Sequence, residues 1–336
     1  MSTSTSGFLG RFADDSEDLV LTLLEYMIWP ILLLVVVCVA VLVPNTFRNI
    51  ISVQLILWQA VPIGLLVLGE SICLLSGHFD LSVGAIMGFS AMFTGMLLGN
   101  CPSCWGVVGS PALGFVIILV VGGLIGVFNG AMISKLGINP FLQTLSTLII
   151  LEGAKTALNT QPVPVPKGYL VPGSIPNLAI LLTLVAFVIV GYAMKYTEFG
   201  QEVYALGSDK DSARAVGVNT DHITIAVYAI SGVLAGLAGL MSTGYTGVVP
   251  PLIGEGQVFP AFAAAVIGGI SLFGGRGKIS GALGGVLLLG VIQAALNISG
   301  VPATQVQVVN GFVLLVAILL YNTQESIRNR ILAASA

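Results

Sequence analysis

The chain has 336 residues, of which 56% are hydrophobic and only 8% are charged, and its mean hydropathy is +1.02. A typical soluble domain has about 25% charged residues, so 27 charged residues (12 basic, 15 acidic) are too few to cover a water-exposed surface of this size. The net charge of −3 without a basic patch excludes a nucleic-acid-binding protein, and the apolar excess excludes a disordered chain. An all-α, polytopic membrane protein remains.

The predicted membrane spans are the long intervals between charged residues, because a spanning helix needs about 20 mostly apolar residues and a charge at the bilayer centre is costly. The intervals are, in chain order, 26–47, 49–69, 81–134 (two spans), 137–158, 168–194, 222–254, 256–275 and 279–324 (two spans). The span at 137–158 is the exception, because it has Glu152 and Lys155 near one end. The interval 256–275 is a short span or a partly re-entrant segment. The total is ten transmembrane helices.

The positions of Lys and Arg orient these spans, since cytoplasmic loops are enriched in basic residues. With the N-terminus in the cytoplasm, nine basic residues fall on inside segments and three on outside ends. The inside residues are Arg11, Lys135, Lys195, Lys210, Arg214, Arg276, Lys278, Arg328 and Arg330, and the outside residues are Arg48, Lys155 and Lys167. Both termini are therefore expected in the cytoplasm.

The expected domain organisation follows from this topology. A cytoplasmic N-terminal segment covers 1–23, the transmembrane domain covers 24–322, and a cytoplasmic tail covers 323–336. No cleavable signal peptide is expected, because the first apolar stretch is full length and lacks a basic segment before it.

One cytoplasmic loop, 195–222, is long and has eight of the 27 charges. Ser208 or Asp209 is suited to cap a short helix that starts there, and Gly217 is suited to end it. A short surface helix of mixed charge indicates docking of a soluble partner. An ordinary solvated loop is the alternative, and composition alone leaves both open.

Polar residues inside or between the spans are the candidates for lining a translocation path. An ionisable residue at membrane depth usually faces a cavity or a partner group, and a non-helical break at that depth must be buried in protein or line water. Glu70 lies in the second span, and a Gly-flanked break follows it. The candidates are Gln59, Glu70, Ser76, His78, Asp80, Ser82, Asn129, Asn139, Gln143 and Thr144.

Some of these candidates have an alternative interpretation. His78 and Asp80 would instead form a short cytoplasmic turn, with the Asp80 side chain capping the following helix. The amide and hydroxyl candidates from Asn129 to Thr144 would instead hydrogen-bond between helices.

Glycines spaced four residues apart predict seams where membrane helices pack closely. The pairs and runs are Gly84 and Gly88; Gly122, Gly126 and Gly130; Gly232 and Gly236; and Gly281 and Gly285.

Other chemistry is not indicated. Cys101 and Cys104 fall on an outside loop. They would form either a disulfide or two free thiols, and the sequence does not decide between these alternatives. No metal site is expected, because the two histidines are far apart in sequence. No cofactor is expected either. The stretch GGRGKISG at 274–281 fails the phosphate-loop pattern. Without a nucleotide site, the energy for any active transport must come from a partner or from an ion gradient.

Four stretches resemble a known family, the permease subunits of ribose-type ATP-binding-cassette (ABC) sugar importers. They are SGHFDLSVGAIMG at 76–88, YALGSDKDSARAVGVN at 204–219, FPAFAAAVIGGISLFGGRGKISGALGGVLLLG at 259–290 and, more loosely, NPFLQTLSTLIILEG at 139–153. Related permeases for branched-chain amino acids and nucleosides share the third stretch but lack DLSVG in this form. The resemblance covers about residues 50–322.

The resemblance implies a homodimer or a heterodimer with a sister permease, two cytoplasmic ABC ATPase subunits and an extracytoplasmic substrate-binding protein. ATP hydrolysis would belong to the separate ATPase, so the permease itself would be no enzyme. The loop would insert into a groove of the ATPase, and the implied coupling residues are Gly207, Asp209, Lys210, Arg214 and Gly217.

The chain departs from the family pattern at a few positions. Asp209 stands where Asn is common. His78 and Phe79 replace small or aliphatic residues, and Glu70 replaces an uncharged polar residue. Since the last three departures bear on the substrate, ribose itself is not assumed.

The predicted function is a permease that forms the translocation pathway for a monosaccharide or a similar small polar solute. A neutral sugar needs amide, hydroxyl and a few carboxyl groups rather than cations, and the spans have this composition. One alternative is a secondary transporter with Glu70 or Asp80 as proton carrier. The others are an ABC permease for a nucleoside or a sugar-like signalling molecule, and a receptor or assembly factor that moves no solute.

Overall fold

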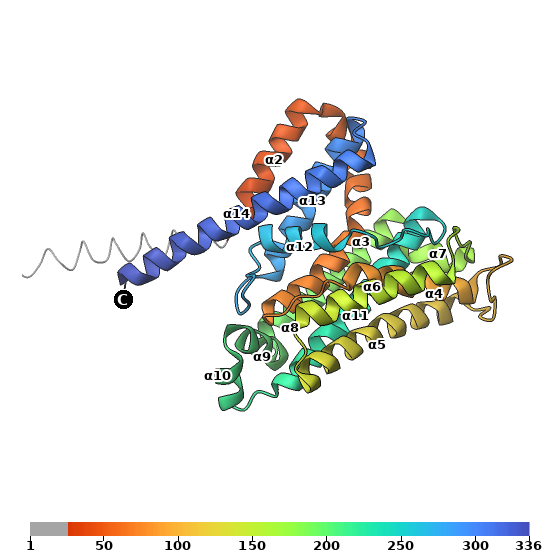
Figure 1. The fold of residues 1–336 in the computed structure, drawn as a ribbon. Helices are drawn as coiled ribbons and strands as arrows, with labels where there is room; N and C mark the ends of the chain where they lie inside the picture. The colour runs from red at the N-terminus through yellow and green to blue at the C-terminus, as the bar shows by residue number, and fades with distance from the viewer. Residues whose placement is uncertain (1–25, 336) are drawn as a thin grey trace, which may run out of the picture.

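A computed structural model describes residues 26–335, and all regular structure in that range is helical (Figure 1). Within those residues the β-pairing consists of one isolated bridge between Val163 and Val249. The predicted N-terminal segment 1–23 lies outside the described residues.

A helix lies at each of the ten predicted spans. These helices are α2 (Ile28–Leu42), α3 (Ile50–Leu75), α4 (Val83–Leu98), α5 (Pro111–Leu136), α6 (Pro140–Leu158), α8 (Pro176–Tyr196), α11 (Thr220–Thr246), α12 (Val258–Ile267), α13 (Ile279–Ile298) and α14 (Ala303–Ser335). Four shorter elements connect them: η1 (Pro44–Phe47), α7 (Lys167–Ser174), α9 (Glu198–Ser208) and α10 (Lys210–Ala215).

Six of the helices within residues 26–335 are long and apolar enough to cross a membrane: α3, α5, α8, α11, α13 and the Gln305–Thr323 part of α14. Three others, α2, α4 and α12, are apolar but shorter. α12 has ten residues, which at 1.5 Å per residue gives about 15 Å, half of a bilayer core of about 30 Å. This agrees with the short or re-entrant segment expected at 256–275.

The predicted glycine seams are confirmed. A Cβ at Gly122 would collide with the backbone of Gly232, and one at Gly126 would collide with the carbonyl of Tyr228. Because both collisions are with backbone atoms, α5 and α11 pack with their main chains in contact, as small residues allow in membrane helices. The other predicted glycines form equivalent contacts: Gly84 and Gly88 with 253–254, and Gly281 and Gly285 with Gly268 and Ala264.

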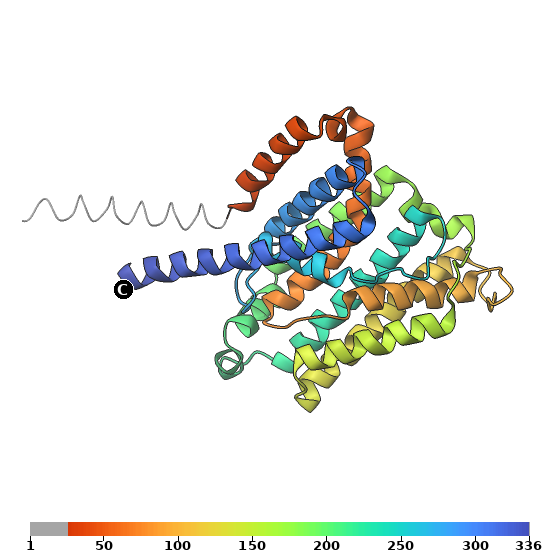
Figure 2. The ribbon, with the colours of Figure 1, turned by 45° about the horizontal axis from the view of Figure 1, so that its top comes forward.

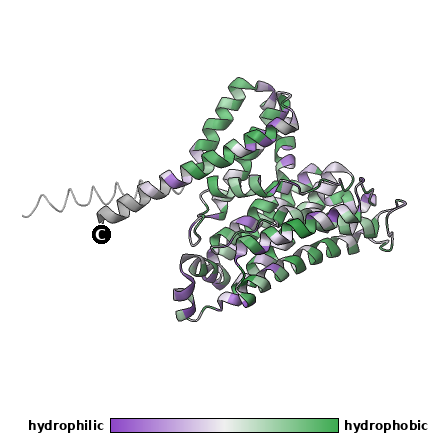
Figure 3. Cartoon of the chain, viewed as in Figure 1, coloured by the Kyte–Doolittle hydropathy of each residue, from purple (hydrophilic) through white to green (hydrophobic). Residues whose placement is uncertain are grey.

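The two ends of the helical body differ in chemistry. α9, α10 and the C-terminal end of α14 lie at one end, and the loop 99–110 and α7 lie at the other (Figures 1 and 2). α10 is hydrophilic, whereas the long helices are mostly apolar (Figure 3). Apolar side chains such as Leu124 and Val188 are largely exposed on these helices, as expected of a surface that contacts lipid.

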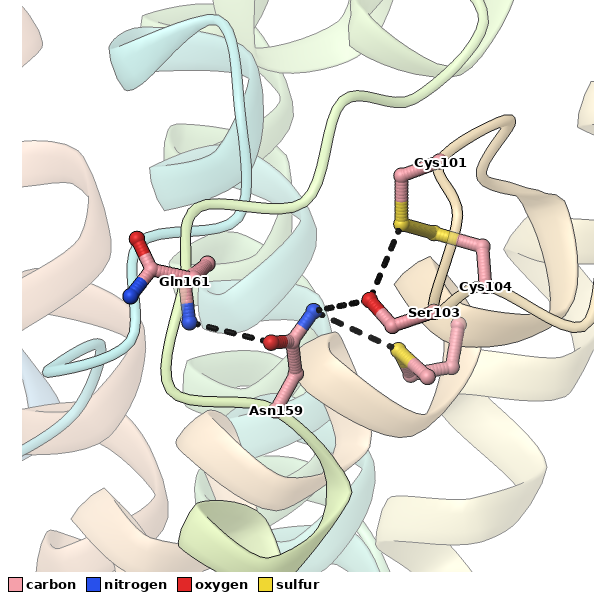
Figure 4. Close-up of a disulfide and its surroundings, with 6 residues drawn as sticks. Cys101, Ser103, Cys104, Asn159 and Gln161 are labelled. Atoms are coloured by element: carbon pink, nitrogen blue, oxygen red, sulfur yellow. Dashed lines mark hydrogen bonds between the residues drawn. A yellow bond between two sulfur atoms is a disulfide. The ribbon is translucent and has the colours of Figure 1, made fainter.

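The loop 99–110 contains a disulfide between Cys101 and Cys104, which decides between the two alternatives that the sequence left open (Figure 4). Asn159, the residue after α6, donates from Nδ2 to Ser103 Oγ at 3.2 Å. The disulfide loop is thereby attached to the end of α6.

Candidate functional site

The segment 76–82 interrupts the helical path between α3 and α4. It begins at the α9 end of the molecule, where Gly77 approaches the backbone of Gly207. It ends beside Asn129, seven residues before the end of α5, or about 10 Å inside that helix end at 1.5 Å per residue. The segment therefore runs from the end of the body back into its interior.

Asp80 is the centre of a buried hydrogen-bond network. Its Oδ1 accepts from the backbone N–H of Ser82 at 3.0 Å and from the Ser82 hydroxyl at 2.5 Å. Its Oδ2 accepts from the hydroxyl of Ser231 on α11 at 3.0 Å. The Asp80 side chain thus fixes Ser82, the residue before α4, whereas α4 itself has no side-chain cap. Asp80 is fully buried, so the alternative of a capping residue in a surface turn is wrong.

The network continues through Asn129 of α5 to α6. Asn129 Nδ2 donates to Ser82 Oγ at 2.9 Å. Asn129 Oδ1 accepts from Thr147 Oγ1 at 2.6 Å and from Gln143 Nε2 at 3.2 Å. Side chains of α5, α6 and α11 are thereby joined to the interrupted segment. Because buried polar groups are costly unless they are paired, this network fixes the path of 76–82.

Glu70 and His78 lie beside the network. Glu70 is buried in α3 and interacts electrostatically with Asp80, and its Oε2 has no hydrogen-bond partner among the described residues. His78 Nδ1 lies 2.9 Å from the Ser76 hydroxyl. The Tyr228 hydroxyl donates to the Phe79 carbonyl at 2.7 Å.

Three predicted candidates lie apart from this network. Gln59 is exposed on α3, and Asn139 caps the start of α6 by accepting from the Phe141 N–H. Thr144 is buried but donates to the Pro140 carbonyl of its own helix. The structure therefore brings together Glu70, Ser76, His78, Asp80, Ser82, Asn129 and Gln143.

A cavity of about 680 Å³ opens next to the network, between α4, α6 and the segment that leads into α12. Leu81, which follows Asp80, forms part of its wall, together with Gly84. Glu152, Gly153 and Thr156 line it from α6, and Glu255 and Phe259 line it from the third side.

Lys155 connects two sides of this cavity. Its Nζ lies 2.6 Å from Glu152 Oε2 and 2.9 Å from Glu255 Oε1, and it donates to the Ile253 carbonyl at 3.3 Å. The Lys155 side chain is 1% exposed, whereas those of Glu152 and Glu255 are 25% and 42% exposed. An ammonium buried this deeply requires such partners.

The triad was not expected from the sequence, where Lys155 served only to orient the spans. The spacing of Glu152 and Lys155 by three residues on an apolar helix was the available signal, because residues at i and i+3 are neighbours on a helix surface. Glu255, 100 residues further on, gave no local signal.

The charged loop forms the predicted short helix. Asp209 caps α10, accepting from the Ser212 N–H at 2.7 Å. Hydrogen bonding from the Ser212 side chain, and after it from the Ser212 N–H, lowers the pKa of the Asp209 carboxyl. α10 ends at Ala215, and Gly217 follows two residues later with a φ of +96°. The Gly217 N–H donates to the Arg214 carbonyl, and the Val218 N–H donates to the Ala213 carbonyl, which is a glycine-terminated helix end.

Arg214 binds to residues at the end of its own loop. Its Nε donates to Thr220 Oγ1 at 2.8 Å, and its guanidinium lies 3.3 Å from Asp221. Asp221 also pairs with Lys135 at the end of α5, at 3.0 Å. Arg214 and Asp221 thus connect α10 to α11 and α5.

Gly207 joins α9 to the interior. A Cβ there would collide with the Leu75 carbonyl at the end of α3 and with the backbone of Gly275 in the loop before α13. The Tyr204 hydroxyl donates to the Gly277 carbonyl of the same loop at 2.8 Å. Lys210 and Val216 face outward, and Val216 is 79% exposed. Val216 was not among the residues expected from the sequence, since an isolated Val in a loop has no distinctive pattern.

Comparisons with known proteins agree with these features. The sequence profile described as "Branched-chain amino acid transport system / permease component" matches residues 52–318. The chain is 33% identical to the ribose import permease protein RbsC of Bacillus subtilis, over 86% of this chain and 90% of that protein. It is 32% identical to the D-allose transport system permease protein AlsC of Escherichia coli, over 88% and 91% of the two chains.

A third relative is the fructose import permease protein FrcC of Rhizobium meliloti, which is 29% identical over 86% of this chain and 83% of that protein. No solved structure gives a significant match.

Proposed function

The chain belongs to the family described as the branched-chain amino acid transport system / permease component, and on this premise we propose that it forms the translocation pathway of an ABC importer for a monosaccharide or a similar small polar solute. It is a multi-pass protein of the cell membrane. The observation that carries the proposal is the charged helix α10 at one end of the apolar body, joined through Gly207 to the interrupted segment 76–82.

The partners follow from this proposal. An ABC ATPase binds the end with α9 and α10 and hydrolyses the ATP, and an extracytoplasmic substrate-binding protein docks at the opposite end. A second copy of this permease or a sister permease completes the pathway. Relatives named as ribose, fructose and allose permeases support a monosaccharide as the solute.

The proposed topology has ten membrane segments with both termini in the cytoplasm. The α9–α10 end is the cytoplasmic one, because it contains Lys210, Arg214 and the C-terminal end of α14 (Figure 1). The membrane domain then covers 24–322, and the tail covers 323–336.

Movement passes along continuous backbone contacts in the proposed mechanism. ATPase closure displaces α10 and α9, and Gly207 transmits the displacement to Leu75 and Gly275. The segment 76–82 moves with the end of α3, and the Asp80 network passes the movement to the starts of α4 and α6. The network residues therefore position the wall of the pathway, of which Leu81 is a part.

The experiment replaces the exposed Val216 by Asp. Val216→Asp should abolish co-purification of the permease with the ABC ATPase encoded with it, because a charge replaces the apolar contact at the outer end of α10. The amount of permease in the membrane should stay unchanged, since the Val216 side chain packs against little of its own chain.

Val107→Asp is the matched control. Val107 is 72% exposed in the disulfide loop at the opposite end, so the same chemical change there should leave ATPase association intact. Normal ATPase association of Val216→Asp, or equal loss in both variants, would remove α10 as the ATPase contact.

A further inference from the structure

We propose that the cavity between α4, α6 and α12 is a solute-binding subsite for an uncharged, hydroxyl-rich molecule. In this subsite Glu152 and Glu255 accept hydrogen bonds from solute hydroxyls, and Lys155 is the positioning residue that holds both carboxylates. This inference rests on the proposed function and assigns the place in the pathway where the solute is held.

Two interrupted helices begin at this cavity. Gly84 and Ala85 lie in the first turn of α4, and Val258 and Phe259 begin α12. From there α4 runs toward the disulfide loop, and α12 runs toward the opposite end. The first N–H groups of a helix have no carbonyl partner within it, and the first turns of both helices line this cavity. Interrupted helices of this kind form solute sites in other transporter folds.

Acceptors come from the two carboxylates. Each of them uses one oxygen on Lys155, at 2.6 Å for Glu152 and 2.9 Å for Glu255. The remaining oxygens, Glu152 Oε1 and Glu255 Oε2, have no hydrogen-bond partner in the described part of the chain. Because both glutamates line the cavity, these oxygens are available to hydroxyl donors, and a hydrogen bond to a carboxylate is among the stronger ones in proteins.

The size and the apolar wall suit a small polyol. The volume of about 680 Å³ falls within the range of about 300–1,000 Å³ that is typical of small-molecule sites. Phe259 is 58% exposed and lies on the wall, where its ring can pack on the C–H face of a sugar.

The charge of the triad selects against anions. Two carboxylates and one ammonium leave a net charge of −1 on the cavity wall. A sugar acid or a sugar phosphate would be repelled by that wall, whereas a neutral monosaccharide would not.

The first test fills the cavity. Gly153 lines it, and a Cβ there would meet no atom within 4 Å, so Gly153→Phe places a ring in open space. Uptake by the complete importer with its ATPase and binding protein should fall at least tenfold, with an unchanged amount of permease in the membrane. Gly311→Phe is the control, because Gly311 is also a helical glycine with no atom within 4 Å of its Cβ position and lies on α14, outside the cavity.

The second test replaces each carboxylate by an amide of the same shape, so that one acceptor oxygen becomes an NH2 group and the negative charge is lost. Uptake of D-ribose, D-fructose and D-allose is measured for the native importer, and the best of them is compared with its 2-deoxy or 3-deoxy analogue. Glu152→Gln and Glu255→Gln should each reduce uptake of the intact sugar about tenfold. For at least one deoxy analogue, the same variants should reduce uptake less than threefold. The binding protein is the same in all arms, so its own selectivity cancels in each variant-to-native ratio.

The outcomes separate this inference from the proposed function. A native importer that takes up none of these sugars contradicts the proposed monosaccharide pathway, and the subsite with it. A native importer that is active, with Gly153→Phe and both glutamine variants within twofold of it, overturns the subsite alone. Equal reduction for intact and deoxy sugars in the glutamine variants also overturns it, because the carboxylates then act on the fold and not on solute hydroxyls. If Gly153→Phe does not reach the membrane, the glutamine ratios decide.

Discussion

Asp80 connects elements that are far apart in the chain through a single carboxylate. It accepts from the backbone and the hydroxyl of Ser82 and from the hydroxyl of Ser231 on α11. Since all these groups are buried, the loss of their common acceptor leaves several donors unpaired, at about 1–3 kcal/mol for each such group.

Asp80→Ala should therefore lower the thermal unfolding midpoint of the purified permease in detergent by several degrees. Asp80→Asn should lower it less, because the amide oxygen still accepts from Ser82 and the Ser231 hydroxyl can accept from the amide nitrogen. Equal midpoints for Asp80→Ala and the native protein would contradict the role of this carboxylate.

Asp209 illustrates a second role for a carboxylate, as the cap of α10. Hydrogen bonds from Ser212 lower its pKa below 3.8, so its stabilising effect is full above the unfolded pKa and is lost as the pH falls through the lower folded value. Amide protection of α10 in hydrogen exchange should then be the same at pH 7 and pH 5.5, after correction for intrinsic rates. Asp209→Ala should reduce that protection at both pH values, because the cap of α10 is lost, and Asp209→Asn should largely keep it. Protection that falls between pH 7 and pH 5.5 in the native protein but not in Asp209→Ala would contradict this account.

The sequence identified part of the polar network and missed part of it. Asp80, Asn129 and Gln143 stood out because charged and amide side chains are rare in apolar helices. Ser231 and Thr147 did not, because a hydroxyl in a membrane helix commonly bonds to a carbonyl of its own helix. A lysine near a helix end is common and did not indicate an ion pair. The partner Glu255 lies 100 residues further along the chain, and the fold brings it to 2.9 Å from the Lys155 Nζ.

Helix packing depends on a few close backbone contacts. Charge-free intervals located the helices because an ion is costly in lipid, and four-residue spacing located the glycine seams, as at Gly126 and Gly232. The break at 76–82 and the short segment that contains α12 were expected from the sequence, but the partners of the break were not. The Phe79 carbonyl accepts from Tyr228 of α11, 149 residues away, and composition does not reveal such a contact.

Two helical glycines should respond in opposite directions to the same change. Gly126→Ala should destabilise the protein by about 1–3 kcal/mol, because its Cβ would collide with the Tyr228 carbonyl. Gly153→Ala should be neutral or stabilising by up to about 1 kcal/mol, since the space there is open and Ala favours a helix. The measurement is the unfolding midpoint of each variant in detergent. A greater loss for Gly153→Ala than for Gly126→Ala would contradict the proposed packing.

The described part of the molecule has a polar loop at one end, a disulfide-bonded loop at the other, and an open cavity where α4 and α12 begin. Backbone contacts at Gly207 link the polar loop to the interior. This arrangement suits a permease that takes its energy from a soluble ATPase, whereas a proton-coupled transporter would work without that loop contact.

The central claim is tested most directly by uptake into proteoliposomes. The permease is reconstituted with its ABC ATPase and its binding protein, and uptake of labelled D-ribose, D-fructose and D-allose is measured with ATP supplied to the ATPase. We expect uptake of at least one of these sugars that requires ATP and both partners. Uptake by the permease alone, driven by a proton gradient without ATP, would contradict the account.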